Sequence, residues 1–278
     1  MSAAGLSSGK GHRDENFPVA SKLIAERHRR PILAFYRFAR AADDVADHPT
    51  ASAGEKLALL EEMDRTLTGE LDSAPDALAL RRVLAELGLG AQHALMLLEA
   101  FRRDVTKLRY ANWDELMDYC RYSAMPVGRF VLDVHGENRS SWTASDALCA
   151  ALQVINHLQD CAKDYRALDR VYLPEDAMRE CGVDVAMLDE PRARPQLRKL
   201  IAMLAERNDA LLGQSRPFAA QIADRRLGLE VSVIQTLAED LNARLKKRDP
   251  LCERVHHRKL ELAPLVCAAF VRHFMRRR

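Results

Sequence analysis

The stretch from Gln153 to Asp164 carries four oxygen-bearing side chains at a spacing that a helix turns to one side. Gln153, Asn156, Asp160 and Asp164 are offset by 0, 3, 7 and 11 residues, so they form a single row on a helix. Two amides and two carboxylates make a poor core face, but they suit Mg²⁺, which takes oxygen ligands. A solvated helix face has the same appearance, so the row alone leaves both interpretations open.

A second acidic cluster, far upstream, favours the cation. Asp43, Asp44 and Asp47 lie within five residues, and Arg40 comes one turn before them. Close carboxylates repel each other, so a helix that carries them gains from a bound cation. The preceding run, 31–39, is too apolar for an exposed helix, and charges in such a segment are expected to be paired or metal-bound. The sequence therefore predicts two acidic helix faces that clamp a diphosphate through Mg²⁺.

The rest of the chain is also patterned as helix. Ala, Leu, Arg and Glu dominate, and alternating β-branched runs are missing, so we expect an all-α protein. Ser52 and Glu55 form a capping box, and Thr143 is expected to cap the helix that contains the polar row. The predicted helices cover 17–28, 31–47, 54–70, 75–87, 91–107, 113–135, 143–166, 174–180, 183–188, 195–213, 216–223, 226–247 and 258–276.

Composition limits the class of protein. The 278 residues are 48% hydrophobic and 29% charged, which is typical of a globular chain with a sizeable core. A net charge of +2 argues against nucleic acid as a partner. Six cysteines without CxxC spacing argue against a zinc site or a disulfide framework and indicate a reducing compartment. The polar N-terminus lacks a signal-peptide core, so we expect a cytoplasmic protein with a flexible lead-in at 1–13 and one domain at 14–278.

The two acidic stretches, DDVAD at 43–47 and NHLQDCAKD at 156–164, resemble the paired aspartate-rich motifs of the squalene/phytoene synthase family. Within that family, the chain is similar to the hopanoid-pathway branch that makes hydroxysqualene from presqualene diphosphate. The resemblance implies a class I isoprenoid synthase fold, in which a single helical domain surrounds a central apolar cavity, with Mg²⁺ as cofactor. It extends over about residues 14–260 through the stretches 15–21, 35–44, 119–128, 170–174 and 248–251.

The resemblance also implies roles for individual residues. Tyr119 is expected near the reacting centre, with Asp43 and Asp160 also catalytic. The implied metal ligands are Asp43, Asp44, Asp47, Asn156, Asp160 and Asp164. The implied substrate-binding residues are Asn16, Phe17, Tyr36, Arg37, Arg40, Ala124, Val127, Gly128, Gln153, Asn156, Arg170 and Tyr172.

Several of these residues also have an ordinary structural explanation. Asn16 stands where a hydroxyl residue is common, and it could simply be a helix N-cap. Arg40 could bind diphosphate or form an ion pair with Asp43 or Asp44. Small residues such as Ala124 and Gly128 serve either an isoprene chain or close helix packing. Tyr119 could be a core tyrosine with a core partner.

Two departures from the family's pattern bear on the chemistry. Met125 and Pro126 replace a usual Ala-Gly neighbourhood, and Pro126 is expected to kink the helix at 113–135 and free the Tyr122 carbonyl for a water. Gln159 stands where an arginine is common, which removes one positive charge. Lys163 and Arg166 flank Asp164 and are expected to neutralise it.

The last helix, 258–276, is apolar with a cationic end. It is interpreted either as a helix that lies on the inner face of the cell membrane or as a last core helix. The implied partners are an isoprenoid diphosphate and other enzymes of the squalene/hopanoid pathway.

Three functions are weighed. The first is conversion of presqualene diphosphate to hydroxysqualene with water as quencher. The second is a squalene or phytoene-type synthase that condenses two prenyl diphosphates. The third is a non-catalytic assembly protein of the same fold, which would be expected to lose the carboxylates that this chain retains.

Overall fold

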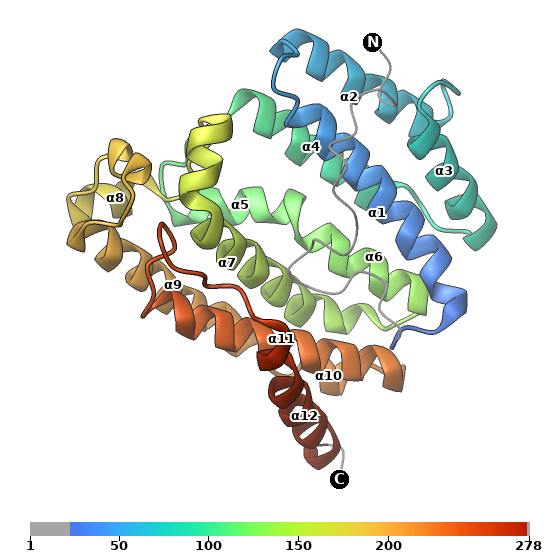
Figure 1. Cartoon of the computed structure of the whole chain (residues 1–278). Coiled ribbons are helices and arrows are strands. Elements are labelled where there is room, and N and C mark those ends of the chain that lie inside the picture. Colours follow the sequence, from blue (N-terminus) through green and yellow to red (C-terminus); the bar gives the residue numbers. More distant parts are fainter. Residues whose placement is uncertain (1–22, 277–278) are drawn as a thin grey trace. The chain divides into compact units, whose positions relative to one another are not determined.

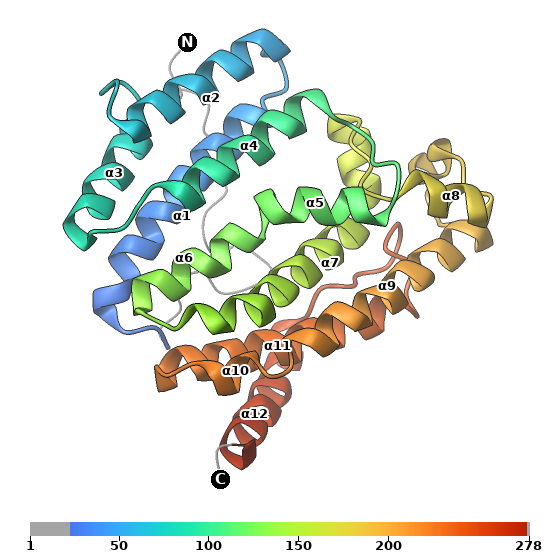
Figure 2. The ribbon, with the colours of Figure 1, turned by 180° about the vertical axis from the view of Figure 1, so that it is seen from behind.

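The computed structural model describes residues 23–276, and every regular element in that range is helical (Figures 1 and 2). The all-α prediction is therefore confirmed. The elements are α1 (Glu26–Ala46), α2 (Ala53–Thr68), α3 (Pro75–Leu87), α4 (Gln92–Thr106), α5 (Trp113–Ser123), α6 (Met125–His135), η2 (Arg139–Ser141), α7 (Trp142–Leu168), α8 (Glu175–Cys181), η3 (Val185–Asp189), α9 (Pro195–Ser215), α10 (Phe218–Gln221), α11 (Arg225–Leu245) and α12 (Lys259–Arg276).

The predicted boundary between the first two helices is wrong. Helix α1 begins at Glu26 and continues through Pro31, which lies inside it. A proline there removes one backbone hydrogen bond, but Pro31, Phe35, Phe38 and Ala42 repeat at helical spacing and are all buried. Burial of this apolar stripe outweighs the lost bond. Residues 23–25 of the predicted helix at 17–28 are not helical, and residues 17–22 lie outside the described residues.

Two helix starts show how local signals compete. The capping box is confirmed: the Ser52 N–H donates to the Glu55 carboxylate at 2.9 Å, and the Glu55 N–H donates to Ser52 Oγ at 3.3 Å. The predicted cap at Thr143 is wrong. A short 3₁₀ turn that Asn138 caps precedes α7, so the helix already begins at Trp142.

The chain divides into two compact units, and it passes between them at 107/108, 125/126 and 137/138. The first unit holds α1 to α4 and α6. Helix α1 packs against α2, α3 and α4, and the Phe35 ring stacks on Phe130 of α6 with 4.1 Å between centroids. The buried core of this unit includes Phe38, Leu60, Leu80 and Leu98.

The second unit holds α5 and the elements from η2 to α12. Helix α7 packs against α5, α9 and α11. Five alanines of α7 are buried and allow close approach: Ala144, Ala147, Ala150, Ala151 and Ala162. A buried amide pair also joins these helices, because Asn208 Nδ2 donates to the Ala151 carbonyl at 3.2 Å and to Asn242 Oδ1 at 3.1 Å.

The predicted kinked helix at 113–135 is two helices. Helix α5 ends at Ser123, Ala124 leaves helical geometry at φ −122° and ψ −48°, and α6 begins at Met125. Pro126 is then the second residue of α6, where its missing N–H costs no helical hydrogen bond. The chain passes between its two units at this break. The single domain predicted at 14–278 stays a prediction.

We predict that Phe130→Ala lowers the free energy of unfolding by about 3–5 kcal/mol, because the ring is 2% exposed and its loss leaves a cavity against Phe35. Val127→Ala, on the same helix, is the control. Val127 is 41% exposed, so its truncation changes stability by less than about 0.5 kcal/mol. Chemical denaturation measures both; equal losses would contradict the packing of α6 through Phe130.

Candidate active site

The acidic cluster of α1 is organised around Arg40. Its guanidinium lies 2.6 Å from the Asp43 carboxylate and 3.1 Å from that of Asp44. Asp44 is buried, and Asp47 caps the helix with its N–H on the Asp43 carbonyl. The ion pair that the sequence offered as the alternative role of Arg40 is therefore present in the structure. A guanidinium is also a suitable hydrogen-bond donor for the oxygens of a diphosphate.

Burial and the neighbouring carboxylates together disfavour the charged form of Asp43. Burial, and after it the negative charge of Asp47, raise its pKa from 3.8 to about 7, although Arg40 acts in the opposite direction. Asp104 of α4 and Asp44 add smaller contributions in the same direction. The cluster therefore holds more negative charge than Arg40 compensates, which is the condition under which a cation stabilises it.

Asp104 was missed by the sequence analysis. It is 6% exposed and lies on α4, which packs against α1. The signal was present: an aspartate on the otherwise apolar side of an amphipathic helix, seven residues after the buried Leu97.

These carboxylates are suitable metal donors, but they are not assembled around a common centre. Among residues 23–276, no group of three or more Asp, Glu, His or Cys side chains has the arrangement of a ready metal site. Two of the carboxylates are instead held by Arg40. The six predicted metal ligands stay a prediction.

The polar row of α7 lies along the open side of that helix. Gln153, Asn156, Asp160 and Asp164 are all half-buried, whereas most residues between them are buried. The helix places the four side chains together because its other faces pack on α5, α9 and α11. The row therefore offers amide and carboxylate oxygens beside a packed core, and such oxygens are the ligands that Mg²⁺ takes.

The prediction that Lys163 and Arg166 neutralise Asp164 is wrong, because both side chains pair with other carboxylates. Lys163 Nζ lies 3.4 Å from the Asp160 carboxylate, and Arg166 Nε lies 2.8 Å from that of Asp189 in η3. Residues one and two positions from Asp164 point to other sides of the helix, so neither cation reaches it.

An aromatic cluster forms at the middle of α7. It consists of Tyr110, Tyr119, Tyr172 and His157, and all four side chains are buried. The His157 ring stacks on Tyr172 with 3.7 Å between centroids and 16° between planes. Tyr119 lies 5.4 Å from Tyr172 and 6.0 Å from His157. The structure thus gathers two predicted site residues, Tyr119 and Tyr172, with two that the sequence analysis did not select.

Backbone hydrogen bonds hold Tyr172 and Tyr110 beside each other. The Val171 N–H donates to the Leu108 carbonyl, and the Glu175 N–H donates to the Tyr110 carbonyl, both at 2.9 Å. Helix α7 ends just before, at Asp169, which adopts a left-handed φ of 52° and accepts a hydrogen bond from Arg109 at 2.6 Å. The turn carries the chain from the polar row to the aromatic cluster within a few residues.

His157 and Arg170 are the two polar members near this cluster. Burial, together with the smaller effect of the Arg170 charge, lowers the pKa of His157 to about 3, so the imidazole is neutral. Its Nε2 atom has no hydrogen-bond partner among the described residues. The sequence analysis missed His157 because it lies beside the polar row, on the packed side of the helix. The predicted site residue Arg170 is itself buried.

The predicted apolar lining is divided between the units. Ala124 is buried in the second unit, while Val127 and Gly128 belong to α6 in the first. Val127 is 41% exposed, which is unusual for a valine in a folded core and leaves it accessible to an apolar ligand. Their role in substrate binding stays a prediction.

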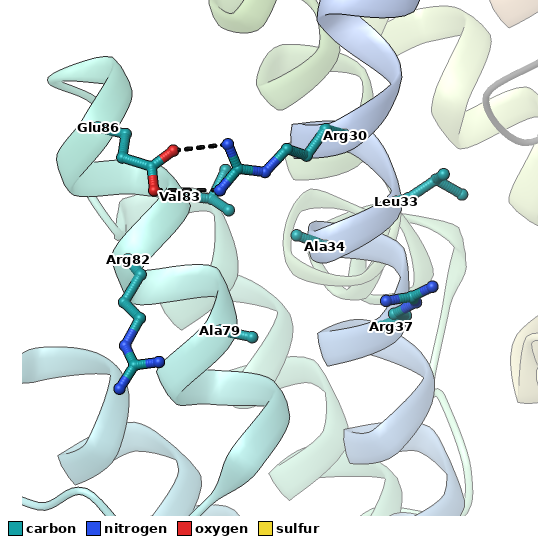
Figure 3. Close-up of a pocket in the computed structure, with 8 residues that line it drawn as sticks. All are labelled: Arg30, Leu33, Ala34, Arg37, Ala79, Arg82, Val83 and Glu86. Atoms are coloured by element: carbon teal, nitrogen blue, oxygen red, sulfur yellow. Dashed lines mark hydrogen bonds and ion pairs between the residues drawn. The ribbon is translucent and has the colours of Figure 1, made fainter.

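Arg37 is separated from the acidic cluster. It is exposed, contrary to the expectation of a charge embedded in a buried segment, and its charge acts on Asp76 of α3. It lines a pocket of about 600 Å³ between α1 and α3, where Arg30 reaches across to Glu86 (Figure 3). Because half of its lining residues are charged, this pocket is not the predicted apolar chamber, which stays a prediction.

Tyr36 is half-buried on α1, next to the buried Phe35. Asn16 and Phe17 lie outside the described residues. The first-unit carboxylates and the α7 row belong to different units, so their meeting across a cavity stays a prediction.

Comparison with known proteins decides the family. The family model described as squalene/phytoene synthase matches residues 11–261. The chain belongs to the squalene/phytoene synthase family. It is 57% identical over 260 residues to the hydroxysqualene synthase of Rhodopseudomonas palustris, covering 94% of this chain and 89% of that protein. It is 56% identical over 271 residues to the hydroxysqualene synthase of Zymomonas mobilis, covering 97% and 91%.

Solved structures confirm the class I isoprenoid synthase fold. The squalene synthase HpnC of Alicyclobacillus acidocaldarius is 32% identical, with a TM-score of 0.73 over 88% of this chain and 92% of that one. A dehydrosqualene synthase in complex with ligand is 22% identical, with a TM-score of 0.77 over 97% and 95%, and supports the fold alone. Membership of the squalene/phytoene synthase family also confirms the prediction of an enzyme, so the assembly-protein alternative is not favoured.

We predict that Asp43→Asn stabilises the metal-free enzyme at pH 8. The folded pKa of Asp43 lies above its unfolded value, so its contribution to stability is fully present below about pH 4 and is lost as the pH rises through 7. The side chain is 32% exposed, which screens the effect, so we expect a gain on the order of 1 kcal/mol, or about 2–4 °C in Tm.

Thermal melts in EDTA between pH 4 and pH 8 measure this gain, which should shrink as the pH falls. Asp118→Asn is the control, because its ion pair with Arg121 lies at the surface and contributes little. A gain that is constant across this pH range would show that buried charge is not its cause.

Proposed function

We propose that this enzyme converts presqualene diphosphate to hydroxysqualene, with water as the quencher and diphosphate as the leaving group. The observation that supports this most is its near full-length likeness to proteins named hydroxysqualene synthase. The retained carboxylates of α1 and α7 support a diphosphate substrate.

Mg²⁺ fits the acidic residues. Asp43, Asp44 and Asp47 supply oxygen donors whose mutual repulsion Arg40 only partly offsets, and α7 supplies Asp160 and Asp164. These are the residues that would hold the ion, with Asn156 as a further oxygen donor. When bound, Mg²⁺ neutralises the diphosphate and makes it a better leaving group.

The remaining side chains have the chemistry that the reaction needs. The carbon–oxygen bond to diphosphate breaks with its electron pair on the leaving oxygen, and Arg40 and Arg170 supply guanidinium donors for that anion. A carbon–carbon bond of the cyclopropane ring opens as the carbocation accepts a lone pair from water, and the released diphosphate takes the proton of the new oxonium group. The enzyme's task is to admit one water to an otherwise dry centre.

A second candidate in the same class is a squalene or phytoene-type synthase that condenses two prenyl diphosphates. One specific observation favours keeping it: the solved relative at 32% identity is named a squalene synthase. Squalene formation ends with hydride, whereas hydroxysqualene formation ends with water, so the origin of the last atom separates the two.

We predict that purified enzyme with presqualene diphosphate and Mg²⁺ gives a C30 alcohol that carries ¹⁸O when the solvent is H₂¹⁸O, with or without NADPH. Mass spectrometry of the product measures the label. The control is Asp160→Asn, which is expected to fold normally because Asp160 is 36% exposed and to lose turnover.

Two results would contradict this assignment. An unlabelled hydrocarbon that forms only with NADPH would indicate a squalene synthase. Efficient use of farnesyl diphosphate by the enzyme alone would indicate a condensing synthase.

We also propose that α12 binds the inner face of the cell membrane, where a C30 substrate and product dissolve. Helix α12 packs on α11 and α10 and extends away from them (Figures 1 and 2). Its inner side includes the buried Ala269, as the core-helix alternative requires. Its outer side is an apolar stripe at helical spacing, and every member is exposed: Leu260, Ala263, Pro264, Cys267, Val271 and Met275.

Charge complementarity supports a membrane as the occupant of this stripe. The sequence places Arg258 and Lys259 at the start of α12 and Arg272 and Arg276 near its end, and each cation near an anionic lipid surface contributes about 1 kcal/mol. None of the described helices is both long and apolar enough to cross a bilayer. An exposed apolar face with flanking cations is typical of a helix that lies in the interface.

We predict that Val271→Glu combined with Met275→Glu lowers partitioning to phosphatidylglycerol vesicles by at least about tenfold, because two apolar side chains that are 57% and 66% exposed would no longer enter the lipid. Activity in detergent should change little. Co-sedimentation measures binding.

Leu87→Glu is the matched control, since Leu87 is an exposed apolar residue on α3 and should leave vesicle binding unchanged. Binding that is indifferent to the double variant would contradict the proposal. Concentration-dependent dimerisation that the double variant abolishes would assign the stripe to a second copy of the chain.

A further inference from the structure

The buried imidazole of His157 has an unmet hydrogen-bonding requirement. The side chain is 6% exposed, and its Nε2 atom has no partner among the described residues. Leaving such an atom unsatisfied costs about 1–3 kcal/mol, and more than nine-tenths of buried polar groups in proteins are hydrogen-bonded to protein or water. A small molecule that donates to this nitrogen would remove the cost.

The ring is fixed where it stands, so it cannot turn to find another partner. It stacks on Tyr172 at 3.7 Å with nearly parallel planes, and Tyr172 is itself anchored by the backbone hydrogen bond from Val171 to Leu108. A neutral imidazole carries one N–H and one lone pair.

The surroundings of His157 match the place where the reaction needs a water. Tyr119, expected near the reacting centre, lies 6.0 Å away between ring centroids. Arg170, expected at the diphosphate, is close enough for its charge to act on the imidazole. Asn156, the preceding residue on α7, belongs to the polar row. The imidazole therefore lies among the groups assigned to the cation, the leaving group and the polar row.

We propose that His157 is the positioning residue that holds the quenching water, accepting a hydrogen bond from it at Nε2. One water O–H donates to the nitrogen, which leaves an oxygen lone pair directed at the carbocation. The carbon–oxygen bond forms from that lone pair, and the oxonium proton passes to the released diphosphate. His157 itself exchanges no proton. This inference rests on the proposed function.

The test compares product ratios in H₂¹⁸O with presqualene diphosphate and Mg²⁺. His157→Phe keeps the aromatic ring on Tyr172 and removes both nitrogens. We expect the labelled alcohol to fall about tenfold as a share of all C30 products, with hydrocarbons formed by proton loss taking its place, while diphosphate release falls much less. His157→Gln, which restores an acceptor, should recover most of the alcohol share.

Ser145→Ala is the matched control. Ser145 lies on the same helix, is fully buried, and its hydroxyl also has no hydrogen-bond partner among the described residues. It is not near the aromatic cluster in sequence, being three turns earlier on α7, so its loss should leave the product ratio unchanged.

The outcomes separate this inference from the function on which it rests. A wild-type enzyme that makes no labelled alcohol overturns the proposed function. A wild-type enzyme that makes it, with His157→Phe giving the same alcohol share, overturns the role of His157. Equal loss of all products in a folded variant also overturns it, because a purely structural role would act in that way. If His157→Phe does not fold, His157→Met, which also lacks the nitrogens, takes its place.

Discussion

Desolvation and mutual repulsion of the carboxylates around Asp43 are the constraint on which the acidic cluster of α1 depends. Asp43 lies in a packed helical environment with Asp44, Asp47 and Asp104 around it, and Arg40 is the counter-charge that holds two of them. Such a cluster lowers the stability of the ligand-free protein. Under the proposed function the same charge density would bind a cation and a diphosphate, so stability would be exchanged for affinity.

Helix α7 meets the opposite requirement, since it must be core and site at once. Its alanines let α9 and α11 approach closely, while its polar row remains half-buried along the open side. Because a helix turns by a constant angle per residue, the packing alanines and the polar row face different sides of α7 although they alternate along its sequence. His157 lies beside the row but on the packed side, which is why a polar nitrogen ends up in an aromatic cluster.

Local signals were sufficient wherever neighbours in sequence decide the outcome. The Ser52–Glu55 capping box, the helical patterning and the single-sided row of α7 follow from spacing alone, and the structure has them. Where a distant contact competes with a local signal, the prediction was wrong. Pro31 predicted a helix start, yet the burial of Phe35 and Phe38 carries α1 through it. Lys163 and Arg166 were expected at Asp164, yet Asp160 and Asp189 are their partners.

The sequence by itself determined the all-α class, the two acidic motifs and, through its resemblance to a family, the type of substrate. These properties depend on residue type and on spacing along one helix, and both can be read directly from the sequence. Only the tertiary structure decided that Arg40 forms ion pairs with both Asp43 and Asp44 and that the charge of Asp104 acts on Asp43. It also decided that His157 is buried against Tyr172. Burial and pairing depend on which distant segments meet, because desolvation and Coulomb interactions act across space and not along the sequence.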